Sequence, residues 1–220
     1  MGPALSSRTT VRRLAHHQVL DRDALDAVLD AGRVAHVAVV DDARPLVVPL
    51  AYARDGDALL VHGSTGSRAF RLLADGADTC VTVTLLDGYV LARAAFEVSM
   101  RYRSAMVLGR FTPLTEADAK LAALVRISEA SVPGRWADLR PPTRKELAAT
   151  SVLRMPLTEW SVKVNDGWPT DEGDDLLRPV WAGVVPVTAT LGPALDAPDL
   201  LDGVDAPHYL DDIPVPGAQV

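Results

Sequence analysis

The chain has 220 residues, 48% of them hydrophobic and 23% charged, with a formal net charge of −7. This length fits one sizeable domain or two small ones, and the composition is globular rather than disordered. The acidic excess argues against non-specific binding to nucleic acid or to an anionic membrane surface. The sequence lacks an apolar run long enough for a membrane helix, and no signal-peptide core follows its first arginines. Cys80 is the only cysteine, so no internal disulfide framework is expected, and we predict a cytoplasmic protein.

The chain begins with an expected N-terminal arm, residues 1–20, that contains some extended structure. A short helix is predicted over residues 21–32. Asp21 can cap its first turn, Leu25 and Val28 lie on one apolar face, and Gly32 stands just past its end.

Residues 33–111 alternate between β-rich segments and short turns. Strands at such close spacing pair in antiparallel fashion, and this many must close into a barrel or pack as a sandwich. The predicted strands are 33–40, 45–53, 58–62, 79–86, 89–95 and 100–111, with turns at 41–44, 55–56 and 87–88.

The second half of the chain is predicted to hold a longer helix and then two more strands. Thr115 is the expected cap of a helix that runs to about residue 130. A helical turn at 144–148 and strands at 151–156 and 157–163 follow. Eight of the sixteen prolines lie beyond Trp168. We therefore expect a split-barrel domain over 21–167 and a proline-rich extension over 168–220, which packs on the barrel or on a partner subunit.

The stretch 59–70 carries the most suggestive chemistry, because a strand there runs into a glycine-bearing turn and then a helix. Glycines allow close backbone approach, hydroxyls can donate to a ligand, and a guanidinium in the first helical turn favours an anion. The same pattern also fits an ordinary strand–loop–helix with a solvated arginine. It is neither a P-loop nor a dinucleotide fingerprint. The residues concerned are Gly63, Ser64, Gly66, Ser67 and Arg68.

Other reactive groups give little support for catalysis. Ser64 is not in a nucleophile elbow, Cys80 lies in a β-rich run typical of a core, and the five histidines lack the spacing of a metal site. No catalytic acid or base can be named, and no metal site is expected. Two further polar clusters could bind an anion or flank a planar ligand, or could be ordinary strand decoration: residues 101–104, and Trp160 with Lys163.

Taken in order, four segments resemble one family: residues 45–50, 62–68, 102–109 and 160–163. The set resembles the pyridoxamine 5′-phosphate oxidase-like, FMN-binding split β-barrel superfamily, and most closely its flavin-nucleotide-binding and nitroimidazole-resistance-reductase branch. The resemblance implies a mainly β fold with peripheral helices, built as an FMN-binding split antiparallel β-barrel. It also implies a homodimer with two FMN sites at the subunit interface.

The same resemblance implies a set of FMN-binding residues. Ser67 and Arg68 would hold the phosphate, and the backbone of residues 47–49 would follow the isoalloxazine edge. Arg103 and Ser104 would add contacts within the site, and Trp160 and Lys163 would approach from the partner subunit. The full expected set is Val47, Val48, Pro49, His62, Gly63, Ser64, Ser67, Arg68, Arg103, Ser104, Trp160 and Lys163.

The expected function is that of an FMN-dependent oxidoreductase acting on a small organic molecule, with NAD(P)H as a possible electron donor. The chain lacks the arginine-rich motif with which vitamin B6 oxidases end, and Ala69 stands where a lysine often follows the phosphate arginine. The substrate therefore need not be a B6 vitamer. Two alternatives stay open: a flavin- or haem-binding carrier or sensor, with His62 as the candidate haem ligand, and an F420-dependent reductase.

Overall fold

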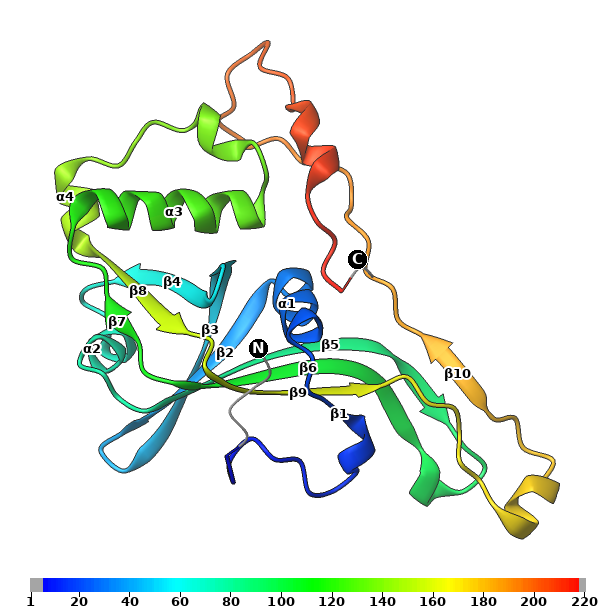
Figure 1. Ribbon diagram of the computed structural model, residues 1–220. Helices are drawn as coiled ribbons and strands as arrows, with labels where there is room; N and C mark the ends of the chain where they lie inside the picture. Colours follow the sequence, from blue (N-terminus) through cyan, green and yellow to red (C-terminus); the bar gives the residue numbers. More distant parts are fainter. Residues whose placement is uncertain (1–5, 218–220) are drawn as a thin grey trace.

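The computed structural model describes residues 6–217 and shows one strongly curved antiparallel sheet with helices on both of its faces (Figure 1). The strand order is β1-β9-β6-β5-β2-β3-β4-β8-β7, and β10 pairs with the far end of β5. The strands are β1 Gln18–Val19, β2 Val34–Asp41, β3 Arg44–Asp55, β4 Ala58–Ser64, β5 Thr79–Leu91, β6 Ser99–Gly109, β7 Thr112–Pro113, β8 Thr150–Pro156, β9 Glu159–Asn165 and β10 Gly183–Pro186.

Within residues 6–217, four α-helices accompany the sheet: α1 Arg22–Ala31, α2 Arg68–Ala74, α3 Ala117–Ser131 and α4 Arg144–Ala149. Short 3-10 turns connect the remaining segments: η1 Ala15–His17, η2 Ala95–Glu97, η3 Arg135–Asp138, η4 Gly173–Leu177 and η5 His208–Asp212. None of the described helices is long and apolar enough to cross a membrane.

The predicted fold class, a mainly β split barrel, is confirmed, although the sheet does not close. β3 pairs with β2 over Arg44–Ala51 but with β4 only over Tyr52–Asp55. β4 pairs with β8 along its whole length, whereas its last residues, 62–64, diverge from β3 and leave an opening between the two strands. Helix α2 packs against β2 on one side of this opening and against β7 and β8 on the other. Its Phe70 and Leu73 are buried in the main core.

The main core lies between the concave face of the sheet and α1. Burial alternates along β2 and β5, as expected when one face of a strand is packed and the other is open. Leu25, Val28 and Leu29 of α1 pack onto that face. A second cluster lies on the opposite face, where Ala123 and Ile127 of α3 cover β3, β4 and β8.

The predicted turn at 87–88 is wrong. β5 continues through it to Leu91, with a bulge between Leu86 and Gly88. The Asp87 carboxylate accepts two hydrogen bonds from Arg103 on the neighbouring strand, so the Asp-Gly pair is held within the sheet. The predicted Thr115 cap is also wrong, because α3 begins one residue later and Glu116 occupies the capping position. The caps at Asp21 and Ser67 are confirmed.

Over its described part, residues 168–217, the proline-rich extension is irregular apart from β10 and two short turns, as expected. Near its start the buried carboxylate of Asp171 accepts hydrogen bonds from the backbone N–H groups of Arg93 and Ala94. Near its end the chain returns to η3, which follows α3, and to α1 (Figure 1). The division into an arm, a barrel domain and an extension remains a prediction.

Candidate functional site

The face of the sheet that points away from the core is partly open to solvent. Val47, Pro49 and Ala51 of β3 lie on it, and their register partners on β2 are Ala38, His36 and Val34. Helix α3 covers one end of this face, and the N-terminal arm reaches the other, where Gln18 and Ser6 contact Ser161 and Glu159 of β9. Between α3 and the N-terminal arm, an apolar strip of this face stays exposed. It contains Val34, Val40 and Val47, whose side chains are each about half exposed or more.

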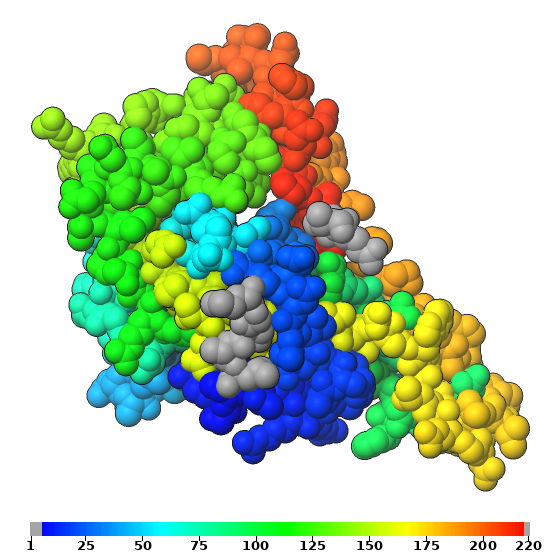
Figure 2. Space-filling model, in the orientation of Figure 1, coloured from blue at the N-terminus to red at the C-terminus, as the bar shows by residue number. Residues whose placement is uncertain are grey.

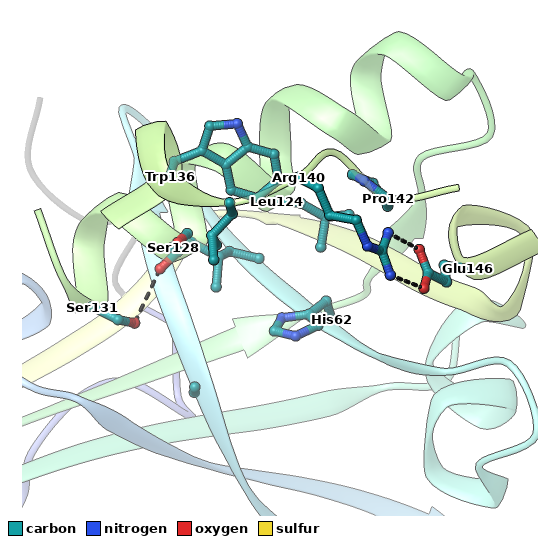
Figure 3. A pocket seen from close by; sticks show the side chains of 11 residues that line it. His62, Leu124, Ser128, Ser131, Trp136, Arg140, Pro142 and Glu146 are labelled. Atoms are coloured by element: carbon teal, nitrogen blue, oxygen red, sulfur yellow. Dashed lines mark hydrogen bonds and ion pairs between the residues drawn. The ribbon is translucent and has the colours of Figure 1, made fainter. Parts of the chain in front are cut away.

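A pocket of about 560 Å³ opens beside this strip. His62 lies at its floor, α3 forms one wall, and the segment between α3 and α4 forms the other (Figure 3). Ala51 of β3 also lines the pocket. Most of the lining is apolar, which is typical of a small-molecule or cofactor site. The wall residues are Leu124, Ile127, Ser128, Ser131, Trp136, Leu139, Arg140, Pro142 and Glu146.

His62 contributes the one imidazole of this pocket. Its ring projects from β4 toward the space beneath Trp136 and Arg140 (Figure 3). Although His62 is exposed to solvent, partial desolvation by neighbouring atoms lowers its pKa below the ordinary value of 6.5. The imidazole is therefore neutral at pH 7, which is the form that ligates a metal.

An ion pair stands at the rim of the pocket. The Arg140 guanidinium contacts both carboxylate oxygens of Glu146, at 2.6 and 2.8 Å. Glu146 also completes a capping box with Thr143 at the start of α4. The side-chain hydrogen bond from Arg140, with the bonds from Thr143, lowers the pKa of Glu146 to about 2. The rim thus holds a fixed carboxylate and a guanidinium whose two Nη groups are both bonded to it.

The strand–turn–helix segment is ordered by its own polar groups. Ser67 Oγ accepts from the backbone N–H of Phe70 at the start of α2, and Ser64 Oγ accepts from the N–H of Gly66 at 3.1 Å. The Arg68 side chain is two-thirds exposed and pairs with Asp41 at the tip of the β2–β3 hairpin. An incoming anion would therefore find Arg68 accessible but would compete with one carboxylate.

The close approach at Gly63 is to a side chain of the protein itself. A Cβ atom on Gly63 would lie 2.3 Å from Cε2 of Phe70. The glycine is explained by packing between β4 and α2, without any ligand.

The backbone of Val47–Pro49 has a free edge. These residues pair with Ala38, Val37 and His36 of β2, but the described part of β4 pairs with β3 only beyond residue 51. The main-chain groups on that side are therefore left without a strand partner, in the opening that leads to Ser64–Arg68. A planar ligand with polar edge atoms can use such groups.

Arg103 and Ser104 face opposite ways, because neighbouring side chains alternate along a strand. Arg103 binds Asp87 and donates to the carbonyl of Gly217 at 2.7 Å, on the α1 side of the sheet. It lines a separate cavity of about 840 Å³ beneath the extension. Ser104 shares the outer face with Lys163, its register partner. One ligand on one face cannot touch both side chains.

Trp160 and Lys163 are also separated by their surroundings. Trp160 is 2% exposed and belongs to the main core, so it is not available to a ligand in this structure. Lys163 lies on the outer face with its ammonium group 6.0 Å from the ring centre of Tyr102. We therefore leave Trp160 out of the proposed site.

Sequence reasoning missed the wall of the His62 pocket. Leu124, Trp136, Leu139 and Arg140 come together only because α3 and the segment after it fold over β4, more than 60 residues away along the chain. The one available signal was Trp136 beside Gly134 and Pro133 at the end of a helix, which reads simply as a helix stop.

The fold and the open sheet face define a split-barrel protein with a pocket next to the split. Residues 21–164 match the family model described as pyridoxamine 5′-phosphate oxidase. This stretch is most of the chain, and the chain therefore belongs to that family. The comparison with curated proteins gave no match.

Among solved structures, two relatives match nearly the whole chain. A FAD and haem binding protein from Mycobacterium smegmatis is 44% identical, with a TM-score of 0.87 over 90% of this chain and 98% of that one. The flavocytochrome Anf3 from Azotobacter vinelandii is 36% identical, with a TM-score of 0.90 over 94% of this chain and 97% of that one. A protein assigned to 5-nitroimidazole antibiotic resistance in Bacteroides thetaiotaomicron shares the fold at 22% identity, with a TM-score of 0.57 over 67% of this chain and 86% of that one.

Proposed function

We propose that this protein is a flavin-dependent oxidoreductase that also binds haem, with His62 as the ligand to the iron. One observation carries the proposal: a neutral histidine in an apolar-walled pocket that adjoins the free edge of β3. The two relatives at 44% and 36% identity, described as a FAD and haem binding protein and as a flavocytochrome, support the same assignment. The proposal joins the oxidoreductase and the haem-binding alternatives raised by the sequence.

The residues of the His62 pocket fit a haem. The neutral imidazole offers a nitrogen lone pair, and Leu124, Ile127, Trp136 and Leu139 provide apolar surface for a macrocycle. The guanidinium of Arg140 at the rim would bind a haem propionate if the propionate replaced Glu146 as its partner. A haem held there would supply one-electron chemistry, and the protein's part is to ligate, orient and shield it.

The flavin would lie along the outer sheet face next to this pocket. Arg68, Ser64 and Ser67 would hold its phosphate, and the free backbone edge of Val47–Pro49 would follow the ring system. These groups serve FMN and FAD alike, because both carry the same ring and the same first phosphate. Pro49, at the proposed flavin site, and Ala51, which lines the His62 pocket, are two residues apart on the same face of β3. The proposed flavin and haem sites are therefore neighbours.

The proposal includes a homodimer, which the positions of the remaining predicted residues support. Lys163 and Ser104 share the outer face with Val47 and Pro49, but β2, β5 and β6 lie between β3 and β9. Lys163 on β9 is thus four strand spacings of about 4.8 Å, roughly 19 Å, from β3, and Ser104 on β6 is three spacings, roughly 14 Å; both are farther than one isoalloxazine ring system reaches. These side chains can serve the same flavin only if a second copy packs face to face. The exposed apolar strip on this face supports such packing.

The test is an absorbance spectrum of the purified protein, with mass spectrometry of the cofactors that heating releases. We expect flavin bands and a Soret band. His62→Ala should remove the Soret band and leave the flavin, and His16→Ala in the N-terminal arm is the matched control. Arg68→Glu should remove the flavin, and Arg144→Glu on α4 is its control. A Soret band that survives in His62→Ala would refute the assigned ligand.

Turnover is tested separately from binding. Flavin that is bleached by NAD(P)H and then reoxidised by a small organic acceptor would support the enzyme. A loaded protein that exchanges no electrons with any donor would leave a carrier or sensor. A protein that binds neither flavin nor haem but takes up F420 would refute the proposal in favour of the F420-dependent reductase.

A further inference from the structure

The outer wall of the His62 pocket has little regular structure of its own. This wall segment, residues 132–142, contains a single 3-10 turn, η3, yet it supplies Trp136, Leu139, Arg140 and Pro142 to the pocket. The shape of the pocket therefore depends on what holds the wall segment in place.

One hold comes from α3. The Glu129 carboxylate accepts from the backbone N–H of Gly134 at 2.7 Å and from that of Trp136 at 2.9 Å. These two backbone hydrogen bonds lower the pKa of Glu129 below its ordinary value. They fix the inner side of the wall segment and leave its outer side to another contact.

The second hold comes from the far end of the chain. Tyr209 of η5 donates its hydroxyl hydrogen to Asp138 Oδ2 at 2.6 Å and accepts from Arg135 Nη1 at 2.9 Å. Its ring also lies against Gly134, where a Cβ atom would be 3.4 Å from Cβ and Cγ of Tyr209. Gly134 has a φ of +82°, so a residue without a side chain is favoured there on both counts. One side chain thus contacts both ends of η3.

The segment that carries Tyr209 is anchored beyond it as well. This return segment, residues 207–217, receives a hydrogen bond from Arg33 Nε at the carbonyl of Pro214 and donates from the N–H of Gly217 to the carbonyl of Ala31. Arg103 of β6 donates to the carbonyl of Gly217. Figure 2 shows the return segment, in red, against the green segment that follows α3. The return segment ties the pocket wall to α1 and to the sheet.

The stretch before the return segment has few such contacts. Leu195 is 91% and Leu201 76% exposed, and the backbone between β10 and η5 has no regular structure. The return segment is thus well anchored, whereas the connection that leads to it has few contacts and could let it move away from the wall segment.

We propose that the return segment is a clasp for the haem pocket and that Tyr209 is its positioning residue. This inference rests on the proposed function, since it assigns the clasp to the same pocket. With the clasp closed, Trp136 and Leu139 are held over His62, and the bound group is released slowly. With the clasp open, the wall segment keeps its contacts with Glu129 and, through Arg140, with Glu146, but loses those with Tyr209.

The first test measures haemin transfer from the loaded protein to an excess of an apo-globin. Tyr209→Phe keeps the ring on Gly134 but loses both hydroxyl contacts, and we expect release about three- to tenfold faster, the size that one or two lost hydrogen bonds confer. Tyr209→Ala should release faster still. Tyr89→Phe, a tyrosine on β5 away from the wall, should match the unmodified protein. Release rates that are equal in all four proteins, with equal unfolding temperatures, would overturn the clasp.

A second test needs no haem. Trypsin cleaves after Arg135, inside the wall segment, and we expect Tyr209→Phe to be cleaved there several times faster than either the unmodified protein or Tyr89→Phe. If the unmodified protein binds no haemin, the proposed function fails, and the cleavage rates still decide the clasp. Unchanged cleavage would refute the clasp whether or not haemin binds.

Discussion

Replacing Gly63 by alanine tests whether this glycine serves packing. The added Cβ atom would lie 2.3, 2.6 and 2.7 Å from three carbons of the Phe70 ring. Carbon atoms settle at about 3.5–4.0 Å, so the ring must move by roughly 1 Å. Phe70 is 4% exposed and enclosed by the main core, which leaves it little room.

Overpacking of this kind costs about 1–3 kcal/mol. For a chain of this size, each kcal/mol lowers the unfolding temperature by about 2–4 °C, so Gly63→Ala should lower it by roughly 2–12 °C. Differential scanning calorimetry of the cofactor-free protein measures the shift. Gly66→Ala is the matched control, because a Cβ atom there would meet only Ser64 Oγ, at an ordinary 3.5 Å.

The double variant Gly63→Ala, Phe70→Leu gives the sharper check. If the clash with the ring is the cause, the two changes are coupled and alanine costs less beside leucine than beside phenylalanine. Additive effects, or a Gly63→Ala protein as stable as Gly66→Ala, would refute the packing explanation. Either result would favour the ligand-binding role that the sequence first suggested for Gly63.

Three further outcomes are expected. Tyr52→Phe removes the buried hydroxyl that donates to the carbonyl of Leu29, and should cost about 1–3 kcal/mol in urea unfolding; a loss below about 0.5 kcal/mol would contradict this. Because the pKa of His62 is lowered from 6.5 in the folded protein, the unfolded chain takes up its proton first as the pH falls, so stability should decrease just below pH 6.5. The unfolding temperature of His62→Gln should lose this part of the pH dependence. Glu146 should titrate near pH 2 by NMR, with its stabilising contribution lost between about 4.5 and 2, and Arg140→Gln should raise that pKa; a value unmoved by Arg140→Gln would show that the pair is not the cause.

The sequence by itself determined the strand pattern and the family. Alternating burial requires alternating apolar residues, and local turn and cap residues mark most element ends, so the strands from Val34 to Gly109 and the caps at Asp21 and Ser67 were predictable. The prediction of a turn at Asp87-Gly88 was wrong because Asp87 pairs with Arg103 on another strand, and this contact outweighs the local preference of Asp-Gly for a turn.

Only the tertiary structure decided what surrounds each candidate residue. Arg103 and Ser104 lie on opposite faces of the sheet because side chains alternate along β6, and Trp160 is buried because its side of β9 faces the core. The order of the motifs along the chain does not reveal which face of the sheet each residue occupies. The His62 pocket joins β4, α3 and the wall segment, and Tyr209 reaches that wall from more than 70 residues farther along the chain. Such contacts depend on packing between distant segments. A local sequence pattern records which residues favour a strand or a helix, but not which distant surface they will meet.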